Sequence, residues 1–262
     1  MQPQLMIAGG LGFIFVMTCL GSATVLIFRK SDTGRIQQIS IGFAAGVMIA
    51  ASVWGLLIPA VEDAEARGLI GWIPAACGFA IGVFFMLGLD SLIPHLHPRS
   101  GVREGIAVKS KRSTLLLFAV TLHNIPEGMA IGLSFALAAQ SNDPAMYSAA
   151  LALAIGIGIQ NFPEGAAIAL PLRQDGVKPW KAFVLGCFSG VVEPIFGIVA
   201  VLLAVRIAPV MPWLLSFAAG TMIYVVVEEL IPEAHLEGHS HAGTLSVMAG
   251  FVLMMVLDMT LG

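Results

Sequence analysis

Long apolar stretches separated by short polar segments run through the whole chain. Four stretches contain no Asp, Glu, Lys or Arg: residues 1–28, 36–61, 68–89 and 207–227. Four more are equally apolar but carry one or two ionisable side chains: about 113–140, 145–172, 180–205 and 242–261. A helix needs about 20 residues to cross a hydrocarbon core of about 30 Å. The pattern therefore predicts eight membrane-spanning helices.

The composition of the chain also indicates a membrane protein. Hydrophobic residues make up 58% of it and charged residues only 11%, whereas soluble domains are about 25% charged. The longest polar segment is 95–112, and no linker of low complexity divides the chain. We therefore predict an all-α integral membrane protein in which residues 1–262 form one transmembrane domain.

The basic residues lie almost entirely on one side of the predicted bundle. Of the 13 Lys and Arg, 11 follow the first, third or fifth span: Arg29, Lys30, Arg35, Arg99, Arg103, Lys109, Lys111, Arg112, Arg173, Lys178 and Lys181. Short cytoplasmic loops carry an excess of Lys and Arg. The charge distribution thus predicts a multi-pass protein of the plasma membrane, or of the inner membrane in a bacterium. Both termini are expected outside the cytoplasm.

Two of the spans share a sequence pattern. Residues 43–49 read Phe-Ala-Ala-Gly-Val-Met-Ile and precede Ile-Pro at 58–59, whereas residues 217–223 read Phe-Ala-Ala-Gly-Thr-Met-Ile and precede Ile-Pro at 231–232. The two spans run in opposite directions under the predicted orientation. Similar sequence in opposite directions is typical of an inverted-topology repeat in a transporter. Chance similarity between helices that pack through small residues is the alternative.

A second repeated motif carries the polar chemistry. The fourth span contains His-Asn-Ile-Pro-Glu-Gly at 123–128, and the fifth contains Gln-Asn-Phe-Pro-Glu-Gly at 160–165. The first and fifth residues of each motif lie on one helix face. Each proline leaves a carbonyl without its helical donor and kinks the helix, and each glycine lets another backbone approach. Facing each other, the two helices would present four ligands: His123, Glu127, Gln160 and Glu164.

Acidic residues without basic partners indicate what such a site would hold. Six lie within or at the ends of the spans: Asp90, Glu127, Glu164, Glu193, Glu228 and Asp258. An unpaired charge at the membrane centre costs about 2.5–3.5 kcal/mol, so cations or protons are the expected partners. One imidazole with two carboxylates and amide oxygens suits Zn²⁺, Fe²⁺, Mn²⁺, Co²⁺ or Cd²⁺. The alternatives are a histidine that bonds neighbouring helices and glutamates that are protonated or relay protons.

These motifs resemble the ZIP (Zrt/Irt-like) family of divalent-metal transporters, of the bacterial type, over the whole chain. The resemblance implies a 3+2+3 arrangement, with the first three and last three spans as inverted repeats around the fourth and fifth. It also implies a principal transport site at the four ligands named above, with Met48 as a weaker candidate. A second site would use Asn124, the residue at position 161 and Glu193. Position 161 is Asn, where two-metal members have Asp, so this chain lacks one carboxylate of a two-metal centre.

The resemblance also implies residues at the two ends of a transport route. The cytoplasmic exit would use Asp90, His95, His97, Glu228 and Glu229. The outer entrance would use Glu62, Asp63 and Asp258, for which a role as ordinary surface acids is the alternative. The three cysteines lie within apolar spans and are interpreted as small core residues.

The expected function is transport of Zn²⁺, or of a similar divalent ion, toward the cytoplasm. Zn²⁺ is then the transported substrate, and no catalytic cofactor is expected. An intramembrane metalloenzyme is the alternative, but the chain has no His-Glu-x-x-His string, and Glu233 occupies the Arg position of Glu-Glu-x-x-x-Arg. A proton-driven carrier of organic solutes would place cations or aromatic residues at the site, where the sequence offers only Phe162. The expected partners are divalent metal ions and bilayer lipids, with no nucleic acid and a homodimer as a candidate assembly.

Overall fold

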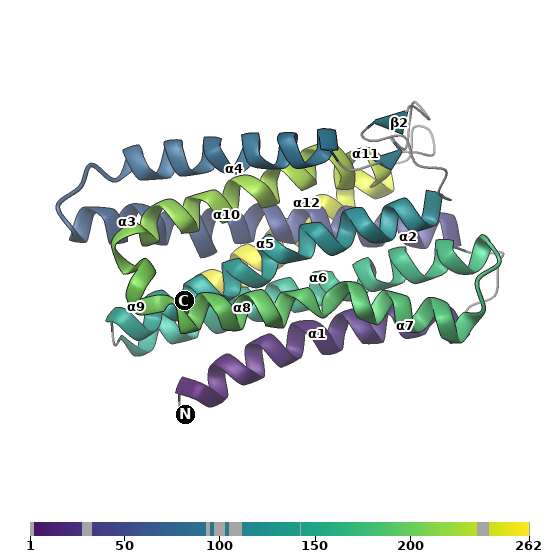
Figure 1. Ribbon diagram of the computed structural model, residues 1–262, viewed down its shortest axis with the longest axis horizontal. Coiled ribbons are helices and arrows are strands. Elements are labelled where there is room, and N and C mark those ends of the chain that lie inside the picture. The colour runs from purple at the N-terminus through teal and green to yellow at the C-terminus, as the bar shows by residue number, and fades with distance from the viewer. Residues whose placement is uncertain are drawn as a thin grey trace.

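The computed structural model describes residues 3–27, 33–92, 95–96, 103–104, 112–141, 143–234 and 241–261. Long helices lie side by side with their axes roughly aligned (Figure 1). The first half consists of α1 (Pro3–Ile27), α2 (Thr33–Ala50), the π-helix η1 (Ala51–Leu57), α3 (Ile58–Ala66) and α4 (Trp72–Leu92). Two short antiparallel strands follow, β1 (His95–Leu96) and β2 (Arg103–Glu104), with His95 opposite Glu104. This small hairpin is the only departure from all-α structure within the described residues.

The second half is helical throughout its described part. Its elements are α5 (Arg112–Ser141), α6 (Pro144–Gln174), α7 (Pro179–Gly190), α8 (Val192–Leu202), α9 (Ala204–Ile207), the 3₁₀-helix η2 (Ala208–Val210), α10 (Met211–Val225), the π-helix η3 (Val226–Leu230), α11 (Ile231–Ala234) and α12 (His241–Leu261). Among the described residues, seven helical stretches are long and apolar enough to cross a membrane. The chain is therefore a helical, multi-pass membrane protein, as the sequence predicts.

Helix α5 is the one predicted span that is not among those seven stretches. It is long enough, with 30 residues. Residues 112–116 and 119 of α5 lie outside the part of the chain whose side chains the structure describes, so the seven stretches do not test this span.

Two spans are longer than the charge-free stretches predicted. The second continues without a break to Ala66, and the seventh continues to Ala234. Consequently Glu62 and Asp63 lie on helix α3, and Glu229 lies on η3 rather than in a loop. A charge ends an apolar stretch but does not end a helix, since Glu and Asp are tolerated where the helix leaves the hydrocarbon.

Both π-helices occur in the first repeated pattern and end directly before an Ile-Pro pair. Helix η1 ends at Leu57, before Ile58-Pro59, and η3 ends at Leu230, before Ile231-Pro232. A proline has no N–H and its ring clashes with the carbonyl four residues earlier. The preceding turn widens to relieve this clash, so the shared sequence has the same effect on the backbone in both spans.

The predicted span 180–205 is divided by a similar effect. Helix α7 ends at Gly190 and α8 begins at Val192, with Pro194 in its first turn. The N–H of Val191 bonds to the carbonyl of Phe188 at 3.2 Å, which is a tighter turn than an α-helix makes. Glu193 therefore lies in the first turn of a new helix.

Glycines bring two pairs of helices into backbone contact. A Cβ atom at Gly46 of α2 would collide with the carbonyl of Val247 on α12. A Cβ atom at Gly220 of α10 would collide with the carbonyl of Phe79 on α4. Gly46 and Gly220 occupy the same place in the repeated pattern, so α2 meets α12 as α10 meets α4. These contacts enclose an apolar core that includes Met48, 2% exposed.

Candidate metal centre

The two motif helices α5 and α6 face each other, and a hydrogen bond joins their polar residues. The Nε2 atom of Gln160 donates to Oε2 of Glu127 at 2.8 Å. Gln160 is fully buried and Glu127 is 2% exposed, while His123 on the same face of α5 is 7% exposed. Glu164 is half-buried on α6. Polar residues of the two motifs thus meet between α5 and α6.

The glycine of each motif permits a second backbone to approach, as the sequence predicts. A Cβ atom at Gly128 would overlap the carbonyl of Glu193 at the start of α8, and one at Gly165 would overlap the carbonyl of Thr18 on α1. Each motif helix thus packs against a different neighbour at the level of its own polar residues. Glu193 reaches the site because Gly128 leaves it room.

Asn161 connects the two motifs to Glu193. Its Oδ1 accepts a hydrogen bond from Nε2 of Gln160 at 2.8 Å. Its Nδ2 donates to Oε2 of Glu193 at 2.6 Å and to the carbonyl of Ile14 at 3.5 Å. Asn161 and Glu193 are both fully buried. The side chain of Asn161 therefore turns its nitrogen, not its oxygen, toward the nearest carboxylate.

Asn124, the remaining residue of the predicted second site, bonds away from this chain of contacts. Its Nδ2 donates to the carbonyl of Ser189 on α7 at 3.2 Å. Three buried oxygen atoms have no hydrogen-bond donor: Oδ1 of Asn124, Oε1 of Gln160 and Oε1 of Glu193. Buried polar atoms normally have partners, so these three oxygens are available acceptors for a cation.

The carboxylates in this region interact with one another. Glu127 lies near Glu193, and Glu164 lies near Glu127 and Glu229, so these carboxylates would repel one another when ionised. In a medium of low dielectric constant this repulsion is strong. Bound positive charge would relieve it, and two of the available oxygens, Oε1 of Gln160 and Oε1 of Glu193, belong to this group of residues.

No cluster of three or more His, Cys, Asp or Glu close enough to hold a metal ion occurs in the described part of the chain. The side-chain amide of Gln160 contacts Glu127, at a position where such a cluster would need a His, Cys, Asp or Glu side chain. A cation held between α5 and α6 would therefore depend on amide oxygens as well as on carboxylates.

The predicted cytoplasmic exit touches this centre through one residue. Nδ1 of His123 lies 3.4 Å from Oε2 of Glu229, whose side chain is 23% exposed. Glu228 is the half-buried neighbour of Glu229 on η3. Asp90 lies in the last turn of α4 and His95 lies in β1, but only their backbones are among the described parts, and His97 lies outside the described residues.

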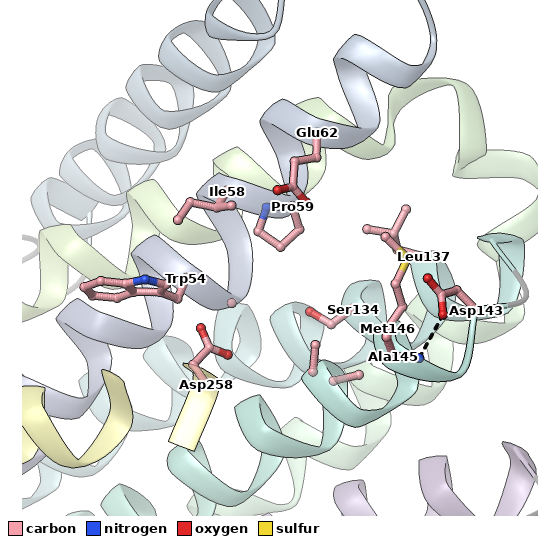
Figure 2. A pocket seen from close by; sticks show the side chains of 13 residues that line it. Trp54, Ile58, Pro59, Glu62, Ser134, Leu137, Asp143, Ala145, Met146 and Asp258 are labelled. Atoms are coloured by element: carbon pink, nitrogen blue, oxygen red, sulfur yellow. Dashed lines mark hydrogen bonds between the residues drawn. The ribbon is translucent and has the colours of Figure 1, made fainter. Parts of the chain in front are cut away.

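The predicted outer entrance is only partly brought together. Glu62 and Asp258 line one cavity of about 340 Å³ between η1, α3, α5, α6 and α12 (Figure 2). Asp63 does not line this cavity. Its Oδ2 instead pairs with Nε of Arg67 one helical turn away, at 2.9 Å. Asp63 lies outside the cavity because adjacent positions on a helix point in different directions, and its role at an entrance stays a prediction.

Trp54, Ser134 and Asp143 are among the lining residues of this cavity that sequence reasoning missed. Asp143 carries a local signal, since Asp before Pro is typical of a helix start. Its Oδ1 indeed accepts a hydrogen bond from the N–H of Ala145 at 2.9 Å. That signal predicts the start of α6 but not what lies across from it. Trp54 and Ser134 carry no sequence signal for the cavity.

Comparison with known proteins gives consistent matches. A family model described as ZIP Zinc transporter matches residues 103–258. The chain is 37% identical to the Zinc transporter ZIP11 of Homo sapiens, over 97% of this chain and 96% of that protein. It is 40% identical to the Zinc transporter ZIPB of Bordetella bronchiseptica, over 95% and 79%. It is 36% identical to the Zinc transporter GufA of Myxococcus xanthus, over 94% of each.

Proposed function

Because the chain belongs to the ZIP zinc transporter family, we propose that it moves Zn²⁺ across the membrane toward the cytoplasm. The family resemblance seen in the sequence is thereby confirmed, and the protein is a transport protein rather than an enzyme. The alternative of an intramembrane metalloenzyme receives no support. Fe²⁺, Mn²⁺, Co²⁺ and Cd²⁺ are further candidate substrates, because the available ligands suit borderline divalent ions.

The proposed architecture has eight spans in a 3+2+3 arrangement, with α5 and α6 between two inverted repeats. Figure 1 supports an even number of crossings, since both chain ends lie toward the same end of the bundle. Helix α5 is then the additional span. The matching π-helices before Ile58 and Ile231 support the repeat, as do the equivalent contacts of Gly46 and Gly220.

The proposed transport site consists of His123, Glu127, Gln160 and Glu164. The observation that carries this proposal is the buried contact between Gln160 and Glu127, which leaves Oε1 of Gln160 without a donor. The two glutamates would neutralise the charge of one divalent ion. Met48 of α2 is buried in the core of the bundle and remains the weaker candidate ligand that the family resemblance implies.

We propose one tightly held ion rather than two. Asn161 donates a hydrogen bond to Glu193, so an N–H group occupies the place where a second cation would meet that carboxylate. A second divalent ion would also raise the positive charge beyond what three carboxylates neutralise in a low-dielectric site. Asn124 would offer only a neutral oxygen.

The proposed route begins at the outer cavity with Glu62 and Asp258, passes the site between α5 and α6, and leaves past Glu229. The contact of His123 with Glu229 supports the last step, because it joins the buried site to a partly exposed acid. The remaining proposed exit residues are Asp90, His95, His97 and Glu228. With basic loops in the cytoplasm, both termini lie outside it in the plasma membrane or bacterial inner membrane.

Zn²⁺ uptake into proteoliposomes tests this function. We expect Glu127→Ala or Glu164→Ala to abolish uptake while circular dichroism and size-exclusion profiles stay like those of the wild type. Each change removes a negatively charged ligand from a buried cation site. Asp63→Asn is the matched control, since that carboxylate pairs with Arg67 at the surface. Uptake near the wild-type rate in both glutamate variants would show that the site is assigned wrongly.

A further inference from the structure

The outer cavity has the size of a site for a small organic molecule. Its volume is about 340 Å³, and ligand pockets in proteins measure about 300–1,000 Å³. A hydrated metal ion alone would leave most of this volume to water. The lining residues therefore need a separate explanation from metal entry.

The deep end of the cavity holds a negatively charged group without a partner. Asp258 is 8% exposed and forms no hydrogen bond or ion pair with other described residues. Figure 2 shows its carboxylate directed into the space between the helices, with Ser134 across from it. The Oγ atom of Ser134 is also buried without a partner. Leaving a buried carboxylate and hydroxyl unbonded is costly, so this end is suited to a cation that also donates hydrogen bonds.

The wall between the deep end and the mouth is mainly apolar. It consists of Trp54, Ile58, Pro59, Leu137 and Met146. The Trp54 ring is held in place by an edge-to-face contact with Phe251, whose centroid is 5.6 Å away. Such a wall accommodates methylene groups, and an indole ring also attracts alkylammonium cations.

The mouth of the cavity carries two further acids, Glu62 and Asp143, and both are exposed. These acids and Asp258 are not close enough to one another to hold a metal ion as a group. One oxygen of Asp143 is also occupied by the N–H of Ala145. The negative charges are therefore separated by an apolar wall instead of converging on one point.

We propose that this cavity binds a linear alkyl diamine or polyamine. One ammonium group donates hydrogen bonds to Asp258 and Ser134, the methylene chain lies along the apolar wall beside Trp54, and the second ammonium group meets Glu62 at the mouth. Binding at this position would hinder the entry of metal ions. That consequence rests on the proposed transport route, whereas the binding itself does not.

Calorimetric titration of cadaverine into the purified, detergent-solubilised protein measures the binding directly. We expect Asp258→Asn to weaken the affinity about tenfold or more, because it removes the charge that a buried ammonium group needs. Ser134→Ala and Glu62→Gln should each weaken it severalfold, and both keep the binding measurable if Asp258→Asn does not fold. Pentylamine, which lacks the second ammonium group, should bind the wild type more weakly than cadaverine does. The Glu62→Gln variant should bind the two amines with equal affinity.

Asp63→Asn is the matched control, because it removes an acid near the cavity that does not line it, and it should leave the affinity for cadaverine unchanged. Binding that is equal in the wild type, Asp258→Asn and Ser134→Ala would overturn the proposal. The proposal would also be overturned by two results together: Mg²⁺ displaces all bound cadaverine at low ionic strength, and cadaverine and pentylamine bind with equal affinity. The cavity would then attract cations by charge alone. If the wild type binds cadaverine but does not transport Zn²⁺, the proposed function is contradicted and this binding site is not.

Discussion

At the scale of single residues, amide groups organise the centre between the motif helices. Nε2 of Gln160 donates to both Glu127 and Asn161, and Asn161 in turn donates to Glu193. The amide N–H groups thereby stabilise two carboxylates that repel each other. This arrangement keeps Oε1 of Gln160 and Oε1 of Glu193 available for a cation.

Asn161→Asp should convert the single-ion site into one that holds a second ion. The substitution replaces an N–H donor facing Glu193 by a carboxylate, so the repulsion between the two acids favours an additional cation. Elemental analysis of the purified protein by mass spectrometry gives the metal content per chain. Asn161→Ser serves as the control, because it removes the N–H donor without adding charge. Two strongly bound ions in the wild type, or the same content in the wild type and the Asp variant, would contradict this prediction.

At the scale of elements, the packing of α5 against α8 depends on the absence of a side chain at one position. Gly128 lies where a Cβ atom would overlap the backbone of Glu193. Gly12 on α1 is a useful contrast, since a Cβ atom there would meet nothing within 4 Å. The two glycines are both helical, so they differ in their surroundings and not in their secondary structure.

Gly128→Ala should destabilise the protein by about 1–3 kcal/mol, the usual cost of forcing extra atoms into a packed interior. Gly12→Ala should leave the stability unchanged or raise it by about 0.5–1 kcal/mol, because alanine favours helix over glycine. Thermal unfolding in detergent, followed by circular dichroism, measures both effects. Equal melting temperatures for the two variants would mean that the close approach of α8 does not limit residue size at position 128.

At the scale of the whole molecule, the turn between α6 and α7 and the turn between α3 and α4 lie at opposite ends of the helical bundle (Figure 1). The turn between α6 and α7 carries the exposed Lys178. The turn between α3 and α4 carries Leu69, which is 46% exposed. Helix α3, which precedes this turn, contains Glu62 and Asp63. The proposed orientation places the first turn in the cytoplasm and the second outside.

Single cysteines at these two turns should therefore react from opposite sides of the membrane. In a background without Cys19, Cys77 and Cys187, Lys178→Cys should be labelled by a membrane-impermeant maleimide only in inside-out vesicles. Leu69→Cys should be labelled in intact cells. Labelling of both cysteines from the same side would contradict the number of spans, and the reverse pattern would invert the direction of transport.

The sequence by itself determined the features that depend on neighbours along one helix. Apolar length predicted the helices, and four-residue spacing placed His123 with Glu127 on one face and Gln160 with Glu164 on another. The Pro-Glu-Gly motifs indicated both the family and the close approach of other backbones. Such features follow from helix geometry and from the dimensions of the bilayer, which are the same whatever the helix packs against.

Only the tertiary structure decided which side chains from different helices meet. It brought Asp143 and Ser134 into one cavity with Asp258. It also turned the nitrogen of Asn161 toward Glu193. These outcomes depend on the distance and rotation between packed helices, which side-chain volumes and glycine contacts set across the whole bundle. No spacing along a single segment of sequence records them.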